Sequence, residues 1–212
     1  MLEKELPKKI SVFPLSNAIF FPRTILPLNI FEKRYLQMVS DSMKENKLFG
    51  MVQPKIQKNK NMGLYKVGCL GKIISFNETK DNRFIIALSG ITRFKITEEV
   101  NNNKLYREFI VDYSEYLKDL KKNEIEEKKY EKNSLLKKVE LLFNKMDCYV
   151  ELKEFKKLSF DQLISTICMI SPFSIEEKQK LIETIETEEK FKALDDIINF
   201  NLLNTQSNKT IQ

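Results

Sequence analysis

Glycine and proline fall almost entirely in the first 90 residues of this 212-residue chain. All five glycines lie there with five of the six prolines, and only Pro172 comes later. Because both residue types mark turns and the ends of elements, this division predicts a turn-rich β domain followed by a helical one. We place the β domain at residues 1–117 and a helical bundle, with a frayed C-terminus, at 118–212. The expected fold class is α+β.

The β domain contains apolar runs bounded by turn residues. These runs predict strands near residues 10–14, 24–29, 48–53, 65–76, 83–88, 92–98 and 106–113. Pro14, Pro22 and Pro27 have no N–H to give to a sheet, so the first two strands should lie at an edge or a bulge. The last two strand pairs are expected to be hairpins of a closed or nearly closed antiparallel sheet.

One helix is expected inside the β domain, at about 31–45. Apolar residues recur there at every fourth position and would form one stripe: Phe31, Tyr35, Val39 and Met43. Beyond the β domain, helical spacing between Leu135 and Val150 predicts a long helix over about 124–152. Two further helices should begin at capping boxes, Ser159 with Gln162 and Ser174 with Glu177. A fourth helix follows Thr187, and the charged segment 118–132 is interpreted as a hinge.

The chain contains no histidine. This excludes Ser-His-Asp and Cys-His catalysis and removes the usual general base at neutral pH. A Ser-Lys dyad remains open on residue types alone, but among so many lysines such a pair is expected by chance, and we rank a hydrolase last. Gly63 and Gly68 have the spacing of a phosphate loop, yet Cys69 and Leu70 stand where Lys and Ser or Thr are required. No catalytic residue and no cofactor are therefore predicted.

Cys69, Cys148 and Cys168 are far apart and form no C-x-x-C motif, so no metal site is predicted. We interpret them as buried small residues in a reducing compartment. The longest uncharged run, 162–175, is too short to span a bilayer and contains a proline. We expect a cytoplasmic protein with no membrane partner.

Several segments of the β domain carry a family resemblance, and they occur in order along the chain. They are Ile10–Leu15, Phe21-Pro22, Leu26–Tyr35, Phe49–Pro54, Leu64–Ile73 and Leu88–Phe94, with Ser171–Lys178 extending the series into the helical part. Together they resemble the N-terminal, substrate-binding domain of Lon proteases, in particular its stand-alone bacterial form. The resemblance implies a PUA-like β pseudo-barrel followed by a helical bundle. It also implies recognition of unfolded or extended polypeptide. For a stand-alone copy, delivery to a separate protease, an adaptor role and an unrelated role all remain open.

The candidate binding residues lie near Pro22 and Pro27, where bulky apolar residues follow one another in the sequence. A half-buried strand hides alternate residues only, so at least one of the residues in 18–22 should face outward. The candidates for an apolar groove are Phe20, Phe21, Ile25, Phe31 and Tyr35. The alternative is that they are core. Arg34 and Arg93 lie in the family-like motifs, and one of them is expected to form a structural clamp with Glu32.

RNA binding is the alternative function. Residues 1–117 hold 19 Lys and Arg against 12 Asp and Glu, a net charge of +7, and PUA-like barrels resemble RNA-binding modules. The lysines that bracket one predicted edge are Lys44, Lys47, Lys55, Lys58, Lys60 and Lys66, and Tyr65 is available to stack on a base. A general lysine bias in the chain explains the same charge, so polypeptide binding is preferred.

Overall fold

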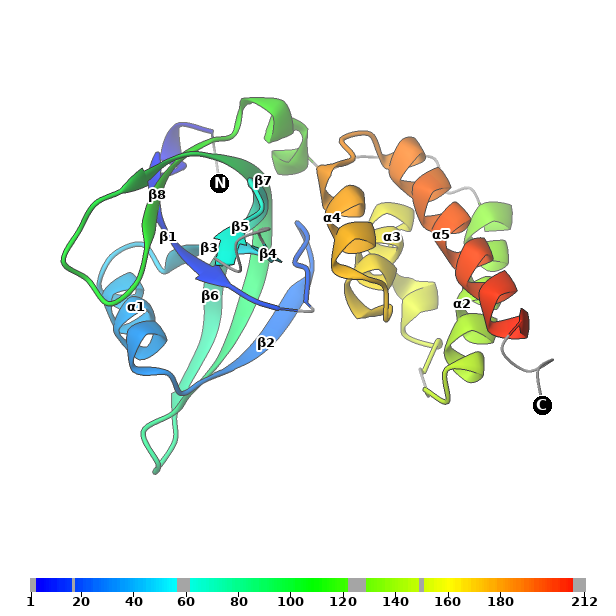
Figure 1. Cartoon of the computed structure of the whole chain (residues 1–212), viewed down its shortest axis with the longest axis horizontal. Coiled ribbons are helices and arrows are strands. Elements are labelled where there is room, and N and C mark those ends of the chain that lie inside the picture. The colour runs from blue at the N-terminus through cyan, green and yellow to red at the C-terminus, as the bar shows by residue number, and fades with distance from the viewer. Residues whose placement is uncertain (1–2, 17, 57–61, 122–128, 149–150, 208–212) are drawn as a thin grey trace. The chain divides into compact units, whose positions relative to one another are not determined.

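The computed structural model describes residues 3–16, 18–56, 62–121, 129–148 and 151–207 (Figure 1). The chain divides into two compact units, Met1–Lys122 and Asn123–Gln212. The first is built from strands with one α-helix and the second from helices, which confirms the α+β class. The sequence placed the boundary at 117. The first unit reaches further because the short 3-10 segment η2, Ser114–Leu120, packs on it.

The first unit is a closed barrel with one extra edge strand. Its main strands are β1 (Lys9–Pro14), β2 (Ile25–Ile30), β3 (Leu48–Val52), β6 (Val67–Glu78), β7 (Phe84–Val100) and β8 (Glu108–Asp112). The sheet order is β2-β7-β6-β3-β1-β8, and β7 also pairs with β8, so the last five strands in this order form a ring. All pairs are antiparallel except β1 with β3. A parallel pair needs a long crossover, which β2 and the following helix supply.

Strand β7 is continuous over 17 residues, so the prediction of two strands at 83–88 and 92–98 was wrong. Its first half pairs with β2 and β6, and its last part pairs with β6 and β8. Gly90 lies between the halves, next to a register shift against β6. A Cβ on Gly90 would lie 2.0 Å from the carbonyl oxygen of Phe21, so the chain can cross β7 only over a glycine.

The smaller elements complete the barrel unit. They are η1 (Glu3–Glu5), the predicted helix α1 (Lys33–Lys44), and a hairpin of β4 (Pro54–Ile56) with β5 (Met62–Leu64). The sequence did not predict this hairpin. Helix α1 buries Tyr35, Met38 and Val39, and the ring of Tyr35 lies 4.2 Å from that of Phe13. The barrel interior is filled by apolar side chains from every strand of the ring, with Leu70, Phe94 and Phe109 among them.

The segment between β1 and β2 differs most from its prediction. Residues 19–21 are not in a strand, and all three side chains are buried, Phe20 at 2% and Phe21 at 0% exposure. The Thr24 hydroxyl and the Thr24 N–H both donate to the Phe21 carbonyl, and Arg23 has a left-handed φ of 61°. The chain therefore turns here and loses the alternation of a strand. The expectation that one of these residues faces outward was wrong.

The second unit contains four α-helices among its described residues. They are α2 (Lys129–Lys145), α3 (Phe160–Ile170), α4 (Ile175–Glu183) and α5 (Thr187–Ser207), with the 3-10 turn η3 (Phe155–Lys157) before α3. Both predicted capping boxes are confirmed at Ser159 and Ser174. Helix α2 ends at Lys145, earlier than predicted, where Asp147 adopts a positive φ. Of the predicted 124–152 span, residues 124–128, 149 and 150 lie outside the described part.

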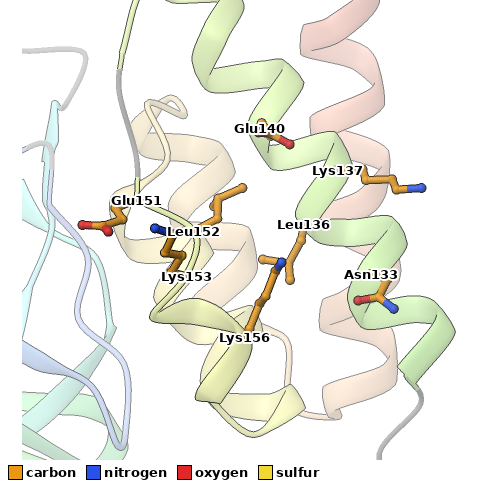
Figure 2. A pocket seen from close by; sticks show the side chains of 8 residues that line it. All are labelled: Asn133, Leu136, Lys137, Glu140, Glu151, Leu152, Lys153 and Lys156. Carbon is orange, nitrogen blue, oxygen red and sulfur yellow. The ribbon is translucent and has the colours of Figure 1, made fainter.

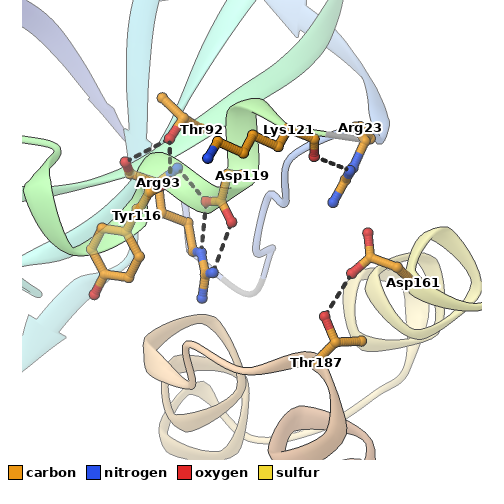
Figure 3. Close-up of polar contacts among 8 residues, drawn as sticks. All are labelled: Arg23, Thr92, Arg93, Tyr116, Asp119, Lys121, Asp161 and Thr187. Atoms are coloured by element: carbon orange, nitrogen blue, oxygen red, sulfur yellow. Dashed lines mark hydrogen bonds and ion pairs between the residues drawn. The ribbon is translucent and has the colours of Figure 1, made fainter. Parts of the chain in front are cut away.

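Polar contacts join the helices of the second unit. The Thr187 hydroxyl donates to Asp161 Oδ1 at 3.2 Å, linking the start of α5 to α3 (Figure 3). Lys132 Nζ donates to the Leu158 carbonyl at 2.6 Å. Lys138 pairs with Asp195 at 2.6 Å, so α2 lies against α5. Between these contacts the core is apolar, with Val139, Ile167, Leu194 and Ile198 almost fully buried.

Candidate functional site

Two of the five candidate groove residues are exposed. Ile25, at the start of β2, is 57% exposed, and Phe31, directly after its end, is 64% exposed. Phe20, Phe21 and Tyr35 are buried and form part of the core, so they cannot present a surface to a partner. The structure thus leaves one candidate at each end of the edge strand.

The register of the sheet adds further residues to this surface. Directly paired residues of antiparallel strands share a face, so Ile25, Pro27 and Asn29 lie on the same face as their partners Ser89, Ala87 and Ile85. Ile85 is 47% exposed. On β6, Ile74 is 54% exposed and lies in the irregularity between Ile73 and Ser75. We call Ile25, Pro27, Ile74, Ile85 and Ala87 the outer apolar face.

The sequence reasoning missed Ile74 and Ile85, although a signal for them was present. Phe84-Ile85-Ile86 is a run of three bulky apolar residues, and here the run belongs to a strand. Alternation then buries Ile86 and turns Ile85 outward. The argument that failed for residues 19–21 holds for residues 84–86, because only the second run is extended and paired.

A charged group lies at the end of β2 where Phe31 is exposed. Arg34 Nε and Nη2 donate to Glu32 Oε2 at 3.0 and 2.8 Å, and the Arg34 guanidinium lies 4.5 Å from the centre of the Tyr35 ring. Burial raises the pKa of the Tyr35 hydroxyl, and the nearby Arg34 charge works against that rise. Both charged side chains of the pair remain about half exposed. The pair therefore orders the start of α1 without removing charge from water.

Arg93 forms a different and buried clamp. Its Nε and Nη2 donate to the two carboxylate oxygens of Asp119 at 2.9 and 2.8 Å, and its backbone N–H donates to the same group at 3.0 Å (Figure 3). The side chains are 2% and 9% exposed. The Tyr116 ring lies 4.7 Å from the guanidinium, and Thr92 Oγ1 donates to the Tyr116 carbonyl. These contacts hold η2 against β7, so Arg93 has a structural position.

Another candidate is a cleft of about 540 Å³ in the helical unit (Figure 2). Its lining residues are Asn133, Leu136, Lys137, Glu140, Glu151, Leu152, Lys153 and Lys156. Leu136 is buried, while the polar side chains are exposed and of both signs. A small-molecule site places a few polar groups in an apolar enclosure. The polar side chains of this cleft are exposed to solvent and are not held in an apolar enclosure, so we do not place the site there.

Metal and nucleotide chemistry gain no support from the described residues. Among them no group of three or more Cys, Asp or Glu side chains could hold a metal ion. Cys69 and Cys168 are buried, and burial raises the pKa of the Cys168 thiol to about 12, whereas Cys148 is exposed, against expectation. Gly68 lies inside β6 instead of in a phosphate-binding turn. The described helices include none long and apolar enough to cross a membrane.

The predicted RNA-binding edge is only partly described. Lys58 and Lys60 lie outside the described residues. Lys55 places its ammonium 5.3 Å from the centre of the Tyr65 ring. A base stacking on this face of Tyr65 would have to displace that lysine, which removes part of the gain from stacking.

Comparison with known proteins gives a consistent result. Residues 9–199 match the family profile of the substrate-binding domain of ATP-dependent protease La (LON). Among curated proteins, the chain is 24% identical over 203 residues to a Lon protease of Anaeromyxobacter dehalogenans and 23% identical over 201 residues to Lon protease 2 of Myxococcus xanthus. Each alignment covers 93% of this chain and 24% of the relative. The chain thus spans about a quarter of the length of these relatives.

Solved structures show the same fold. The N-terminal domain of Mycobacterium avium complex Lon protease matches with a TM-score of 0.63 at 15% identity, covering 91% of this chain and 98% of that one. A Lon N-terminal domain protein from Xanthomonas campestris matches with a TM-score of 0.62 at 18% identity, covering 89% and 97%. The arrangement of a barrel unit followed by a helical unit is therefore shared with these domains.

Proposed function

We propose that this chain, which belongs to the family of ATP-dependent protease La (LON) substrate-binding domains, binds unfolded or extended polypeptide. The observation that carries the proposal is the outer apolar face together with Phe31. Several large apolar side chains, each 47% exposed or more, lie on or beside three neighbouring strands: Ile25, Phe31, Ile74 and Ile85. Apolar groups gathered in this way are typical of surfaces that bind other proteins.

The expected affinity follows from these side chains. Fully burying an Ile or Phe side chain is worth about 1.5–3 kcal/mol, and roughly half of each is already buried in the fold. Three or four such contacts give a few kcal/mol before the cost of ordering the partner. We therefore expect these apolar contacts alone to give weak binding, of about millimolar Kd, since 1 mM already corresponds to about 4.1 kcal/mol; such binding suits transient contact with many unfolded sequences.

The family and the residue content support a recognition role without catalysis. Relatives that contain this domain are Lon proteases about four times as long as the aligned region. The chain has no histidine, and the described residues offer no metal centre. We propose that this chain recognises the polypeptide and that a protease, on the same or a separate polypeptide, degrades it.

Binding to a permanently unfolded protein tests the proposal. Reduced and carboxymethylated lactalbumin is a suitable probe, followed by fluorescence anisotropy. Ile25→Asp and Phe31→Asp should each weaken binding by at least ~1 kcal/mol, because each places a carboxylate where an apolar contact was. Phe200→Asp is the matched control, since Phe200 is 60% exposed but lies in the helical unit. Equal affinity in all four proteins would refute the assigned surface.

Salt separates this function from RNA binding. Apolar contact predicts little change in affinity between low and moderate salt. RNA binding predicts a steep fall, by roughly one unit of log–log slope for each phosphate contact, and sensitivity to charge reversal at Lys55. Binding of a single-stranded RNA that shows this slope and survives Ile25→Asp would favour the alternative.

A further inference from the structure

Strand β2 is an edge strand, and its hydrogen-bond pattern with β7 determines which of its backbone groups face the free side. Within the described part of the chain its one neighbour is β7. The Gly90 N–H donates to the Thr24 carbonyl at 3.0 Å, which makes the next pair along, Ile25 with Ser89, a non-hydrogen-bonded pair. The two kinds of pair alternate along the strand, so Pro27 and Asn29 also belong to non-hydrogen-bonded pairs. The backbone polar groups of these three residues therefore point away from β7.

Pro27 is compatible with this hydrogen-bond pattern. Its missing N–H would have faced the free edge, so the proline costs the pairing with β7 nothing. The edge thus offers an N–H and a C=O at Ile25, a C=O at Pro27, and an N–H and a C=O at Asn29. No described residue supplies a partner for these groups, and all three residues are exposed.

The spacing of these groups identifies the occupant. They repeat every second residue, about 6.6–6.8 Å apart in an extended strand. An extended polypeptide backbone presents alternating donors and acceptors with the same repeat, so it can pair with both ends of the edge at once. Ile25 and Pro27 lie on one face of the edge strand itself and provide apolar contact for every second side chain of an added strand.

We propose that β2 receives a segment of the bound polypeptide as an added β-strand, paired with the backbone of Ile25, Pro27 and Asn29. This rests on the proposed function and specifies how the polypeptide is held: backbone hydrogen bonds supply affinity for any sequence, and the outer apolar face favours segments with apolar residues at alternate positions. Pro27 removes the central donor. Without this donor the edge forms fewer hydrogen bonds with an added strand and does not pair permanently, which suits a site that must release what it binds.

The first experiment changes the ligand and leaves the protein intact. The probe is a fluorescent peptide of about eleven residues in which valine and threonine alternate, with glutamate at both ends for solubility. Two further peptides carry N-methyl groups on all valines or on all threonines. In an added strand only alternate N–H groups face the neighbour. One methylated peptide should bind at least about tenfold more weakly and the other within about twofold of the parent. Which one fails reveals a parallel or antiparallel orientation.

The second experiment changes the edge. Pro27→Val restores the missing donor, so it should tighten binding of the parent peptide by about two- to tenfold. The same variant should gain nothing with the peptide whose edge-facing nitrogens are methylated. Asn29→Pro removes an edge-facing donor without touching the pairing with β7, and it should weaken binding by at least about twofold. Thermal unfolding must first show that both variants keep the wild-type transition.

The outcomes separate the inference from the function on which it rests. Equal binding of the two methylated peptides overturns the added strand, even if unfolded lactalbumin still binds and Ile25→Asp still weakens it. A Pro27→Val protein that dimerises without binding the peptide more tightly also overturns it, since the edge would then take a second copy. Failure of wild-type protein to bind either probe overturns both proposals together.

Discussion

The two halves of β7 belong to different kinds of sheet. From Thr92 to Lys95 the strand pairs with β6, and from Lys95 to Val100 it pairs with β8 and closes the barrel. From Phe84 to Ser89 it lies between β6 and β2, in an open sheet with a free edge. Between the segments paired with β2 and with β8, residues outside the sheet hydrogen-bond to the strand. Gly90 accepts from the Arg23 N–H and donates to the Thr24 carbonyl, and the Arg93 N–H donates to the Asp119 carboxylate. Strand β7 thus changes partners along its length, from β2 to loop residues and then to β8, while β6 pairs with it as far as Lys95.

This difference assigns stability and recognition to different ends of one unit. The closed end pairs its strands into a ring and buries the Arg93–Asp119 pair, so it lacks the free edge of the open end. The open end buries its inner face under Phe20 and leaves its outer face and edge exposed. Binding surfaces are commonly positioned in this way by a rigid scaffold. Variants at the closed end or beneath the inner face of the open end should therefore change stability, and variants on the outer face or edge of the open end should change binding.

The largest effect is expected from a matched pair of phenylalanines. Phe20→Ala should destabilise the protein by about 3–5 kcal/mol, because it leaves a cavity beneath the open sheet. Phe31→Ala should stay within about 0.5 kcal/mol, because the side chain is already 64% exposed. Urea unfolding measures both. Similar losses in the two variants would break the distinction between the inner and outer surfaces.

Arg93→Met should cost somewhat less, about 3 kcal/mol. It leaves the Asp119 carboxylate nearly buried without its partner, and the slight exposure of Asp119 places the cost at the lower end for a broken buried pair. Arg93→Met with Asp119→Asn should recover at least half of the loss, since the amide oxygen still accepts from the backbone N–H. A double variant no more stable than the single one would mean that Arg93 acts through packing alone.

The cysteines allow the same variant to be followed unit by unit. Cys69 is buried in the barrel unit and Cys168 in the helical unit, and the exposed Cys148 should react first with a thiol reagent. Arg93→Met should raise the labelling rate of Cys69 by up to about 100-fold, in line with its loss of stability. The rate at Cys168 should change little, because Asp119 and Tyr116 belong to the barrel unit. Equal acceleration at both would show that the units open together.

Local patterns predicted what depends on local physics. The capping boxes at Ser159 and Ser174 and the edge position of the Pro27 strand each follow from a few neighbouring residues, and the structure has them. The edge prediction was wrong for the Pro14 strand, because β1 pairs with both β3 and β8. The parallel pairing of β1 with β3 and the continuity of β7 depend on long-range crossings. No window of sequence contains that information, so these features were missed.

The residues of the candidate site also divide into those whose exposure follows from local sequence and those whose burial depends on distant segments. Exposure of Ile25 follows from its place in an edge strand, which proline chemistry predicts. Burial of Phe20 and Phe21 depends on the chain crossing over Gly90, about 70 residues further on. The partner of Arg93 is likewise 26 positions away, at Asp119, and no sequence pattern links the two. Contacts between distant segments decided which apolar residues became surface.

The smallest effect is expected at the open end, from Arg34. Arg34→Gln removes the pair with Glu32, but both side chains are about half exposed, and exposed pairs contribute about 0–1 kcal/mol. Urea unfolding should show a change within about 0.5 kcal/mol, and whatever difference remains should shrink as salt screens the charges. A loss comparable to that of Arg93→Met would mean that the start of α1 holds the open sheet in place. Binding defects at Ile25 and Phe31 would then have to be reinterpreted as loss of structure, because the surface they share would depend on that pair.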